Sequence, residues 1–449
     1  VCRLAGHARI AAGGEANTVL RQYMDDLSAV PMVRACRLGA TQRGESDRGT
    51  VQNFEMTLLL VELPADRVVD FDVHAPPGGT TDLHGAWKKL HEGPDIVWAP
   101  YHGGHWIFTR YEDIDFAQRH HDPFSMRDVT MPANTRPTRL LPLEADPPEH
   151  TPFRAILNPW FSPKRISDLK DFTRQFAVDL IEGFRPRGEC EFMADFALIL
   201  PIAIFMRLTN LPMDDRVKLL RYAQMSTRGN AQQRHEAATL MMAYLMPVIE
   251  DRKAHPGDDV LSTVVHSKPN GQPINPTDLM SMLLVILFGG LDTVASTLGF
   301  IANFMASSPA HRRQLIENPA LVDAAVEELM RRFAPSATAR TMTRDYEYKG
   351  LTFRAGDKIY ITPLMAGLDD RRYPNAMQVD FTRPDNQHNS FGAGPHRCPG
   401  SLLAKLEIKL FLQEWLARIP DFTVKPGEPV VYGPGQVNCV ERLVLSWPA

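Results

Sequence analysis

The chain has 449 residues, of which 44% are hydrophobic, and its formal net charge at pH 7 is -4. This composition supports a soluble globular chain with an ample core, and the charge gives no electrostatic reason to expect nucleic-acid binding. The five cysteines are odd in number, widely spaced and without a Cys-x-x-Cys pair. A disulfide framework and a zinc site are therefore not expected, and a reducing cytoplasm fits.

Residues 1–55 carry scattered charge and small residues without a sustained period. The run Gly44–Gly49 is of the polar kind that cannot bury a core. We therefore expect residues 1–55 to be a disordered or non-native N-terminal extension, with Met56 as the native start; a regulatory arm is the alternative. Residues 63–449 show no linker or composition break, which predicts one large domain.

Within this domain, short β-like runs at residues 96–98 and 105–108 predict a small sheet, and residues 147–337 have a mostly helical pattern. Short strands are expected after residue 340, and an alternating run at residues 440–445 predicts a hairpin arm. The fold class is therefore mainly α with minor antiparallel β-sheets. The longest uncharged apolar run, 279–291, is shorter than the roughly 18 residues that span a bilayer, so no membrane anchor is expected.

One helix is predicted to begin at Asn275, followed by Pro276 at its first position. It is apolar on all sides over residues 283–288, so it should be buried. Gly289, Gly290, Asp292 and Thr293 then interrupt it. Each glycine costs about 1 kcal/mol relative to alanine, and a buried acid needs a partner. Residues that break the rules for a buried helix indicate a functional site. The alternative is that the glycines serve packing and the two polar residues are hydrogen-bonded to each other or to neighbours.

A single cysteine, Cys398, follows a glycine-rich loop that begins at Ser390, and a helical pattern starts near Ser401. A helix N-terminus favours the thiolate over the thiol. A thiolate presented in this way is suited to axial ligation of haem iron. The alternative is a buried, inert cysteine, which is the commoner fate of a lone thiol.

The loop pattern Phe-Gly-x-Gly-x-His-x-Cys-x-Gly over residues 391–400, the pair Glu328 and Arg331, and the run 289–293 resemble the cytochrome P-450 family of haem-thiolate monooxygenases. The runs 290–294, 146–150 and 419–422 look like its bacterial camphor hydroxylase branch. The likeness covers about residues 63 to 447. It implies a cytochrome P-450 fold with a single haem-binding domain and haem b as cofactor.

The resemblance also implies roles for individual residues. It makes Cys398 the iron ligand, Thr293 and Asp292 the groups that deliver protons, and Glu328 with Arg331 a structural pair behind the cysteine loop. It assigns the haem propionates to His150, Arg154, Arg340 and His396, each of which alone is typical of a surface salt bridge. Further contacts with haem are implied for Gly289, Gly290, Thr293, Ser390, Phe391, Gly392, Pro399, Gly400 and Ala404. Proline at 399 lacks the backbone N–H that would otherwise point at the sulfur.

The chain departs from the camphor branch around the expected substrate. Thr138 stands where that relative has a tyrosine, Phe288 replaces a smaller aliphatic residue, and Thr338 replaces an aspartate. Camphor itself is therefore not the expected substrate, and a small, mostly apolar terpenoid or norisoprenoid ketone or alcohol is. Substrate contacts are expected from Thr138, Leu140, Val285, Phe288, Ser336 and Val437.

No Gly-x-Gly-x-x-Gly motif opens a βαβ unit, so electrons must come from another protein. The resemblance implies a [2Fe-2S] ferredoxin with its NAD(P)H-dependent ferredoxin reductase, which would dock near Arg110, Arg154 and Arg397, and O2 as co-substrate. We expect a soluble, cytoplasmic monomer of bacterial type. A peroxide-driven haem enzyme and a haem-binding sensor without turnover are the alternatives, and an intact Asp292, Thr293 and Cys398 disfavour both.

Overall fold

The computed structural model describes residues 2–9, 33–46, 49–60, 63–133 and 138–448. The chain divides into two compact units. The first comprises residues 1–72 and 96–107, and the second comprises residues 73–95 and 108–449. Every residue that the sequence predicts for the functional site belongs to the second unit.

The first unit contains strands where the sequence suggests disorder. Strand β3 (Gly49–Leu60) pairs antiparallel with β1 (Cys2–Arg9) and with β2 (Val33–Ser46). The expectation of disorder is therefore wrong for these segments. Their ladder uses backbone groups that every residue except proline carries, so it forms without the alternating side-chain pattern by which strands are predicted. That residues 1–55 lie outside the native domain stays a prediction.

The first unit also holds β4 (Ile96–Ala99) and most of β5 (His105–Phe108), which the sequence predicts as β-like runs. The Trp98 and Trp106 rings meet edge to face, with 5.2 Å between their centroids. Aromatic pairs of this geometry add stability beyond the area they bury. These strands therefore have an apolar cluster of their own.

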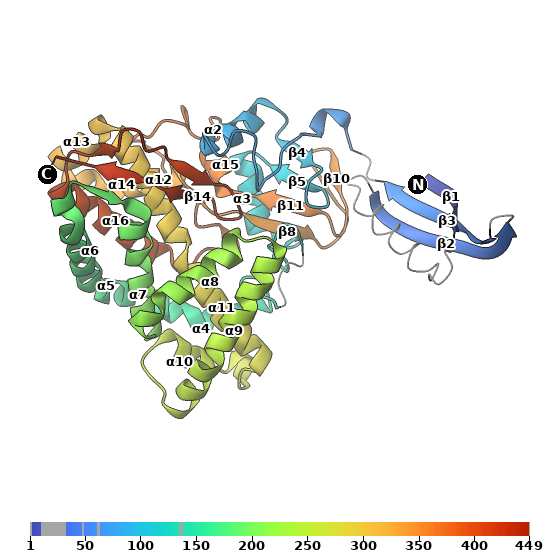
Figure 1. Cartoon of the computed structure of the whole chain (residues 1–449), viewed down its shortest axis with the longest axis horizontal. Helices are drawn as coiled ribbons and strands as arrows, with labels where there is room; N and C mark the ends of the chain where they lie inside the picture. Colours follow the sequence, from blue (N-terminus) through green and yellow to red (C-terminus); the bar gives the residue numbers. More distant parts are fainter. Residues whose placement is uncertain (1, 10–32, 47–48, 61–62, 134–137, 449) are drawn as a thin grey trace. The chain divides into compact units, whose positions relative to one another are not determined.

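The second unit is mainly helical with small antiparallel sheets, as predicted (Figure 1). Its helices are α2 (Leu83–Lys88), α3 (Tyr111–Arg119), α4 (His150–Leu157), α5 (Pro163–Asp168), α6 (Lys170–Phe184), α7 (Ile199–Thr209), α8 (Arg216–Arg228), α9 (Ala231–Ala254), α10 (Val260–Val265), α11 (Pro276–Leu291), α12 (Thr293–Ser307), α13 (Pro309–Glu317), α14 (Val322–Arg332), α15 (Pro363–Gly367) and α16 (Ser401–Arg418).

Its strands are β6 (Phe124–Ser125), β7 (Glu189–Glu191), β8 (Thr338–Met342), β9 (Tyr346–Tyr348), β10 (Leu351–Phe353), β11 (Lys358–Ile361), β12 (Thr423–Val424), β13 (Val431–Gly433), β14 (Cys439–Arg442) and β15 (Val444–Ser446). Strand β8 pairs antiparallel with β11 and β6, and β9 with β10. Strand β15 lies between β12 and β7, while β13 pairs with β14. The short strands expected after residue 340 are confirmed.

The helix predicted from Asn275 is α11, and it begins as expected. The Asn275 side chain accepts a hydrogen bond from the Asp278 N–H at 2.9 Å, and Pro276 takes the first position. The helix packs against α7, α8 and α9, and it runs through the second unit in Figure 1. It ends at Leu291, and α12 starts at Thr293 after Asp292, whose φ is -116° and ψ -31°. The predicted mid-helix irregularity is therefore a break at the acid.

The stretch Pro276–Ser307, which joins α11 and α12, is long and apolar enough to cross a membrane by length and composition, with a mean hydropathy of 1.9. However, 65% of the apolar window is buried within the protein. A buried core helix passes the same test, so the stretch is weak evidence for a membrane span.

The Glu328 and Arg331 pair lies in α14 and has no exposed surface. Two parallel hydrogen bonds of 2.8 Å join the guanidinium to the carboxylate. Arg383 adds a third charge, with Nε 3.2 Å from Glu328 Oε2. Arg331 also donates to the carbonyl of Ala376 at 2.9 Å. Since every charge is hydrogen-bonded, this buried network can hold the segment between α15 and the cysteine loop, as the implied structural role requires.

Candidate functional site

The cysteine loop is shaped by two glycines with left-handed backbone. Gly392 has φ +74° and Gly394 has φ +68°. A Cβ at residue 394 would lie 2.9 Å from Arg119 Cα, so the loop passes too close to α3 for any larger residue. The Cys398 N–H donates to the Phe391 carbonyl at 2.8 Å and closes the loop. This geometry presents the thiol directly before α16.

Cys398 differs from the cysteines at 190 and 439, because it is exposed and they are buried. Surrounding protein atoms nevertheless desolvate its thiol and raise its pKa, while the Gly400 N–H and the charges of Arg154 and Arg397 act to lower it. The helix N-terminus alone therefore does not produce a low pKa. Coordination by a metal deprotonates a thiol outright, so Cys398 does not need a low pKa in the metal-free protein in order to bind iron.

Only one of the two residues after the cysteine can donate a backbone hydrogen bond to the sulfur. Pro399 has no N–H, and the Gly400 N–H is the one directed at Cys398 Sγ. A Cβ at residue 400 would lie 3.8 Å from this sulfur, so the backbone at the start of α16 is close to the Cys398 thiol. The Ala404 N–H donates to the Gly400 carbonyl at 3.0 Å and continues the helix.

A group of cationic and imidazole side chains lies beside this loop, as predicted for the propionates. The rings of His150 and His396 meet edge to face, with 4.6 Å between centroids. His150 Nε2 is buried without a hydrogen-bond partner among the described residues. Arg340 is 4% exposed and donates to the Thr338 hydroxyl at 2.9 Å and the Ala339 carbonyl at 3.2 Å, both uncharged acceptors.

Burial dominates the electrostatics of this group. Desolvation lowers the pKa of Arg340 to about 10. The pKa of His150 is lowered to about 4, mainly by desolvation and also by the charges of His396 and Arg154. Desolvation also lowers the pKa of His396. Asp146 behaves differently: burial opposes ionisation, but His396, the Met126 N–H and the Ser125 hydroxyl hold its pKa at about 2. The group therefore contains one stable anion.

Arg154 lies on the cysteine side of this group. Its Nε donates to Asn158 Oδ1 at 2.8 Å, and its Nη2 donates to the Arg397 carbonyl. The structure therefore brings His150, Arg340 and His396 together, with Arg154 adjacent to the ligand loop. Ser390, predicted as a haem contact, donates its hydroxyl to the Met330 carbonyl at 2.8 Å and so ties the loop to α14.

At the break between α11 and α12, Asp292 is fully buried and forms an ion pair with Arg228 at the end of α8. Arg228 Nε lies 3.2 Å from Asp292 Oδ2, and its Nη2 also donates to Ser296 at 3.2 Å. The neighbouring Thr293 hydroxyl donates to the Gly289 carbonyl at 3.3 Å. Asp292 and Thr293 thus face different partners.

The two glycines of this helix have different surroundings. Gly289 is exposed, and a Cβ there would meet nothing within 4 Å. A Cβ at Gly290 would lie 2.6 Å from Phe205 Cδ2 on α7. Gly290 therefore permits close helix packing, which is the alternative given above for the glycines of this helix, whereas Gly289 faces open space.

The residues predicted to bind substrate come from several elements. Ser336 and Val437 are brought together by an antiparallel bridge, flanked by hydrogen bonds from Ala337 N–H to Gln436 at 2.8 Å and from Asn438 N–H to Pro335 at 2.9 Å. Leu140, Phe288 and Val437 are buried, and Thr138, Val285 and Ser336 are half-buried.

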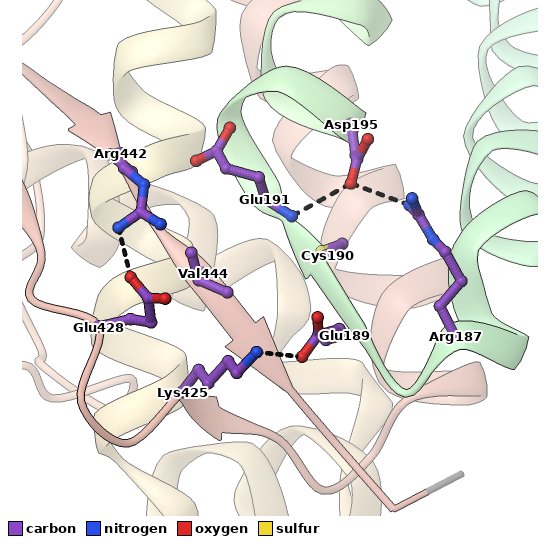
Figure 2. A pocket seen from close by; sticks show the side chains of 9 residues that line it. All are labelled: Arg187, Glu189, Cys190, Glu191, Asp195, Lys425, Glu428, Arg442 and Val444. Carbon is purple, nitrogen blue, oxygen red and sulfur yellow. Dashed lines mark hydrogen bonds and ion pairs between the residues drawn. The ribbon is translucent and has the colours of Figure 1, made fainter.

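One surface pocket lies outside these groups, and a second adjoins them. The pocket in Figure 2, about 400 Å³, pairs its charges internally, as in Lys425–Glu189 (2.5 Å), Arg442–Glu428 (2.6 Å) and Arg187–Asp195 (2.9 Å). It contains no predicted site residue. The second, about 390 Å³, is lined by Arg127, Asp146, Pro147, Pro148, Glu149 and Asn270, and so reaches the anion beside His396.

The donor set fits a haem group. An accessible thiol, an unpartnered buried imidazole nitrogen and a buried guanidinium without a carboxylate in ion-pair range among the described residues match the needs of an iron and two propionates. Sequence reasoning missed two residues, the partner Arg228 and the anion Asp146. Asp146 was visible within the run 146–150, whereas Arg228 precedes its partner by 64 positions without any motif.

Comparisons with known proteins agree with this geometry. The model of the cytochrome P450 family matches residues 202–430. The chain is 32% identical to a probable cytochrome P450 127A1 from Sinorhizobium fredii, over 86% of this chain and 96% of that protein. It is also similar to the crystal structures of CYP101J2 (37% identity, TM-score 0.79, 86% of this chain and 98% of that one) and CYP101C1 (36%, 0.80, 86% and 99%).

Proposed function

Because the chain belongs to the cytochrome P450 family of oxidoreductases, which bind haem through a cysteine thiolate, we propose that it hydroxylates a small apolar substrate with O2 and electrons from a [2Fe-2S] ferredoxin. The proposal rests above all on Cys398, whose exposed thiol follows a glycine-shaped loop and receives the Gly400 N–H. When bound, haem supplies the iron at which O2 is activated.

The residues around Cys398 would hold this group in place. His150, Arg340 and His396 would pair with the porphyrin carboxylates, with Arg154 adjacent to them. Arg340 suits this role because it is buried and its hydrogen bonds go to uncharged acceptors. A carboxylate there would offset the desolvation of the guanidinium. The other predicted haem contacts would lie against the porphyrin, namely Gly289, Thr293, Ser390, Phe391, Gly392, Pro399, Gly400 and Ala404.

Thr293 and Asp292 would control proton delivery. The Thr293 hydroxyl bonds only weakly to Gly289, at 3.3 Å, so it can turn toward the reacting oxygen and hold a proton there. Asp292 is held by Arg228, whose side chain is 20% exposed and so links the buried carboxylate to solvent. Arg228 would hold Asp292 in position between solvent and Thr293.

The proposed substrate is a small terpenoid or norisoprenoid ketone or alcohol. Support comes from the apolar side chains of Leu140, Phe288 and Val437, which are buried, and of Val285, which is half-buried. The half-buried Thr138 and Ser336 would supply hydroxyl groups. A site with few polar groups selects mainly by shape. Phe288 reduces the room beside α11 relative to an aliphatic residue, which favours a compact molecule.

Members of this family need a redox partner, and we propose a ferredoxin with its NAD(P)H-dependent reductase. The support is Arg397, which is exposed one residue before the ligand and presents positive charge there. Ferredoxins suit such a surface when they are acidic. The buried Arg110, by contrast, pairs with Asp95 at 2.9 Å and is committed to the core, which removes it from the proposed docking face. We retain the proposal of a cytoplasmic monomer.

A reconstitution tests the proposal. The protein is combined with a ferredoxin, its reductase and NADH, after terpenoids have been screened by the substrate-induced shift of the Soret band. Hydroxylated product that depends on the ferredoxin supports the proposal. Product formed only with added peroxide would favour the peroxide-driven alternative, and a Soret shift without product under either condition would favour a sensor.

A further inference from the structure

Asp146 stands between a surface pocket and the buried imidazole pair. One side of it lines the pocket of about 390 Å³ together with Pro147, Glu149 and others. On the other side, its Oδ1 lies 3.8 Å from the buried His396 Nε2, which is longer than a hydrogen bond but within ion-pair distance. Its backbone carbonyl accepts the His150 N–H at 3.0 Å, at the start of α4. A single residue therefore contacts both imidazole-bearing segments.

The carboxylate of Asp146 is itself held firmly. Oδ1 accepts the Met126 N–H at 3.0 Å, and Oδ2 accepts the Ser125 hydroxyl. Its side chain is 13% exposed. Among the described residues, no other carboxylate lies within ion-pair distance of His150, His396 or Arg340. The anion that faces this group is thus held by hydrogen bonds from the end of β6 and from the residue that follows it.

We propose that Asp146 is a positioning residue for haem: it holds the His396 ring through its carboxylate and the His150 segment through its carbonyl, so that both imidazoles face the porphyrin carboxylates. The inference rests on the proposed function. Groups that orient the direct partners of a bound metal centre commonly change its affinity by about 10–100-fold when they are removed.

Two simpler roles make different predictions. A residue that only shapes its own loop would act through Ser125 and Met126, independently of His396. A residue that acts only as a charge would repel the porphyrin carboxylates, so its neutralisation would slow the loss of haem. A positioning residue acts in the opposite direction, because its removal frees the ring that holds the carboxylate. The sign of the effect therefore separates these roles.

Asp146→Asn removes the charge and keeps a carbonyl oxygen and an amide for Met126 and Ser125. The rate of haem transfer from the ferric protein to excess apomyoglobin should rise about ten-fold or more. Glu149→Gln is the matched control: Glu149 lines the same pocket, is exposed and pairs with Arg139 at 3.1 Å, so the rate should not change. Ser125→Ala, which loosens the carboxylate without removing its charge, should raise the rate by a smaller factor.

A double-mutant cycle gives the decisive reading. In the His396→Asn background, Asp146→Asn should no longer change the rate, because its effect runs through that ring. An undiminished effect in that background, slower haem loss in Asp146→Asn, or wild-type rates in both Asp146→Asn and Ser125→Ala would overturn the inference. Wild-type protein without the red-shifted ferrous–carbonyl band would instead overturn the thiolate ligation by Cys398, and with it the basis of this inference.

Discussion

The adjacent glycines of α11 should respond to the same substitution with opposite changes in stability. In a helix interior, alanine is favoured over glycine by about 1 kcal/mol. At Gly289 a Cβ meets nothing within 4 Å, so Gly289→Ala should gain most of this amount. At Gly290 the Cβ would meet two atoms of the Phe205 ring, at 2.6 and 2.9 Å. Overpacking of this kind costs about 1–3 kcal/mol.

The net effect of Gly290→Ala is therefore a loss of about 0–2 kcal/mol against a gain of up to about 1 kcal/mol for Gly289→Ala. Thermal unfolding of the haem-loaded proteins, followed by circular dichroism, measures the difference. For a chain of this size, 1 kcal/mol corresponds to a shift of roughly 1 °C in the midpoint. We expect the Gly289→Ala midpoint to rise and the Gly290→Ala midpoint to fall.

The Phe205 ring supplies an internal control. Phe205→Leu makes room beside residue 290, so the penalty of Gly290→Ala should shrink or vanish in that background. Equal shifts for the two alanine variants, or a Gly290→Ala penalty that is unchanged after Phe205→Leu, would refute the assignment of Gly290 to packing. Enzyme activity gives a second measurement: Gly289→Ala should lower the rate of O2-dependent turnover although it stabilises the fold.

Cys398→Ser should abolish the strongly red-shifted ferrous–carbonyl band typical of thiolate haem, and retention of the band would contradict ligation by this residue. Thr293→Ala should keep substrate affinity and NADH consumption but divert O2 to peroxide, so an unchanged product yield per NADH would remove it from proton delivery. Arg228→Met should destabilise the protein by about 3–5 kcal/mol, because it removes the ion pair of the buried Asp292. Most of the lost stability should be regained in the double variant with Asp292→Asn. Pro399→Leu restores a second amide near the sulfur, so a redox titration of the substrate-free protein should give a higher iron potential, and an unchanged or lower one would argue that the proline only rigidifies the loop.

Features that depend on local backbone rules could be predicted from the sequence. The start of α11 at Asn275 follows from a capping side chain and a proline at the first position. The break at Asp292 follows from two glycines and an acid within an apolar helix. The loop before Cys398 follows from glycines where the backbone is left-handed. In each case the signal and the structure lie within a few residues of each other.

Features that depend on a distant partner could not be predicted. Gly289 and Gly290 are identical in sequence terms, and only the position of Phe205, on another helix, separates an open site from a packed one. The strands β1, β2 and β3 were missed for a related reason, because a backbone ladder does not require an alternating pattern. Propensity describes a residue and its neighbours, whereas these outcomes are decided by contacts between elements.

The two acids of the site illustrate this division. The sequence can indicate that an acid lies among apolar residues, and a carboxylate that is buried there needs a compensating partner. The rule does not say which partner: Asp292 is matched by Arg228 from the end of α8, and Asp146 by Ser125 and Met126 with His396 beyond them. Since both acids are held from other elements, their positions are set by the packing of the fold and not by their own segments. Substitutions in α8 and β6 should therefore also alter the proposed haem site, from outside its motifs.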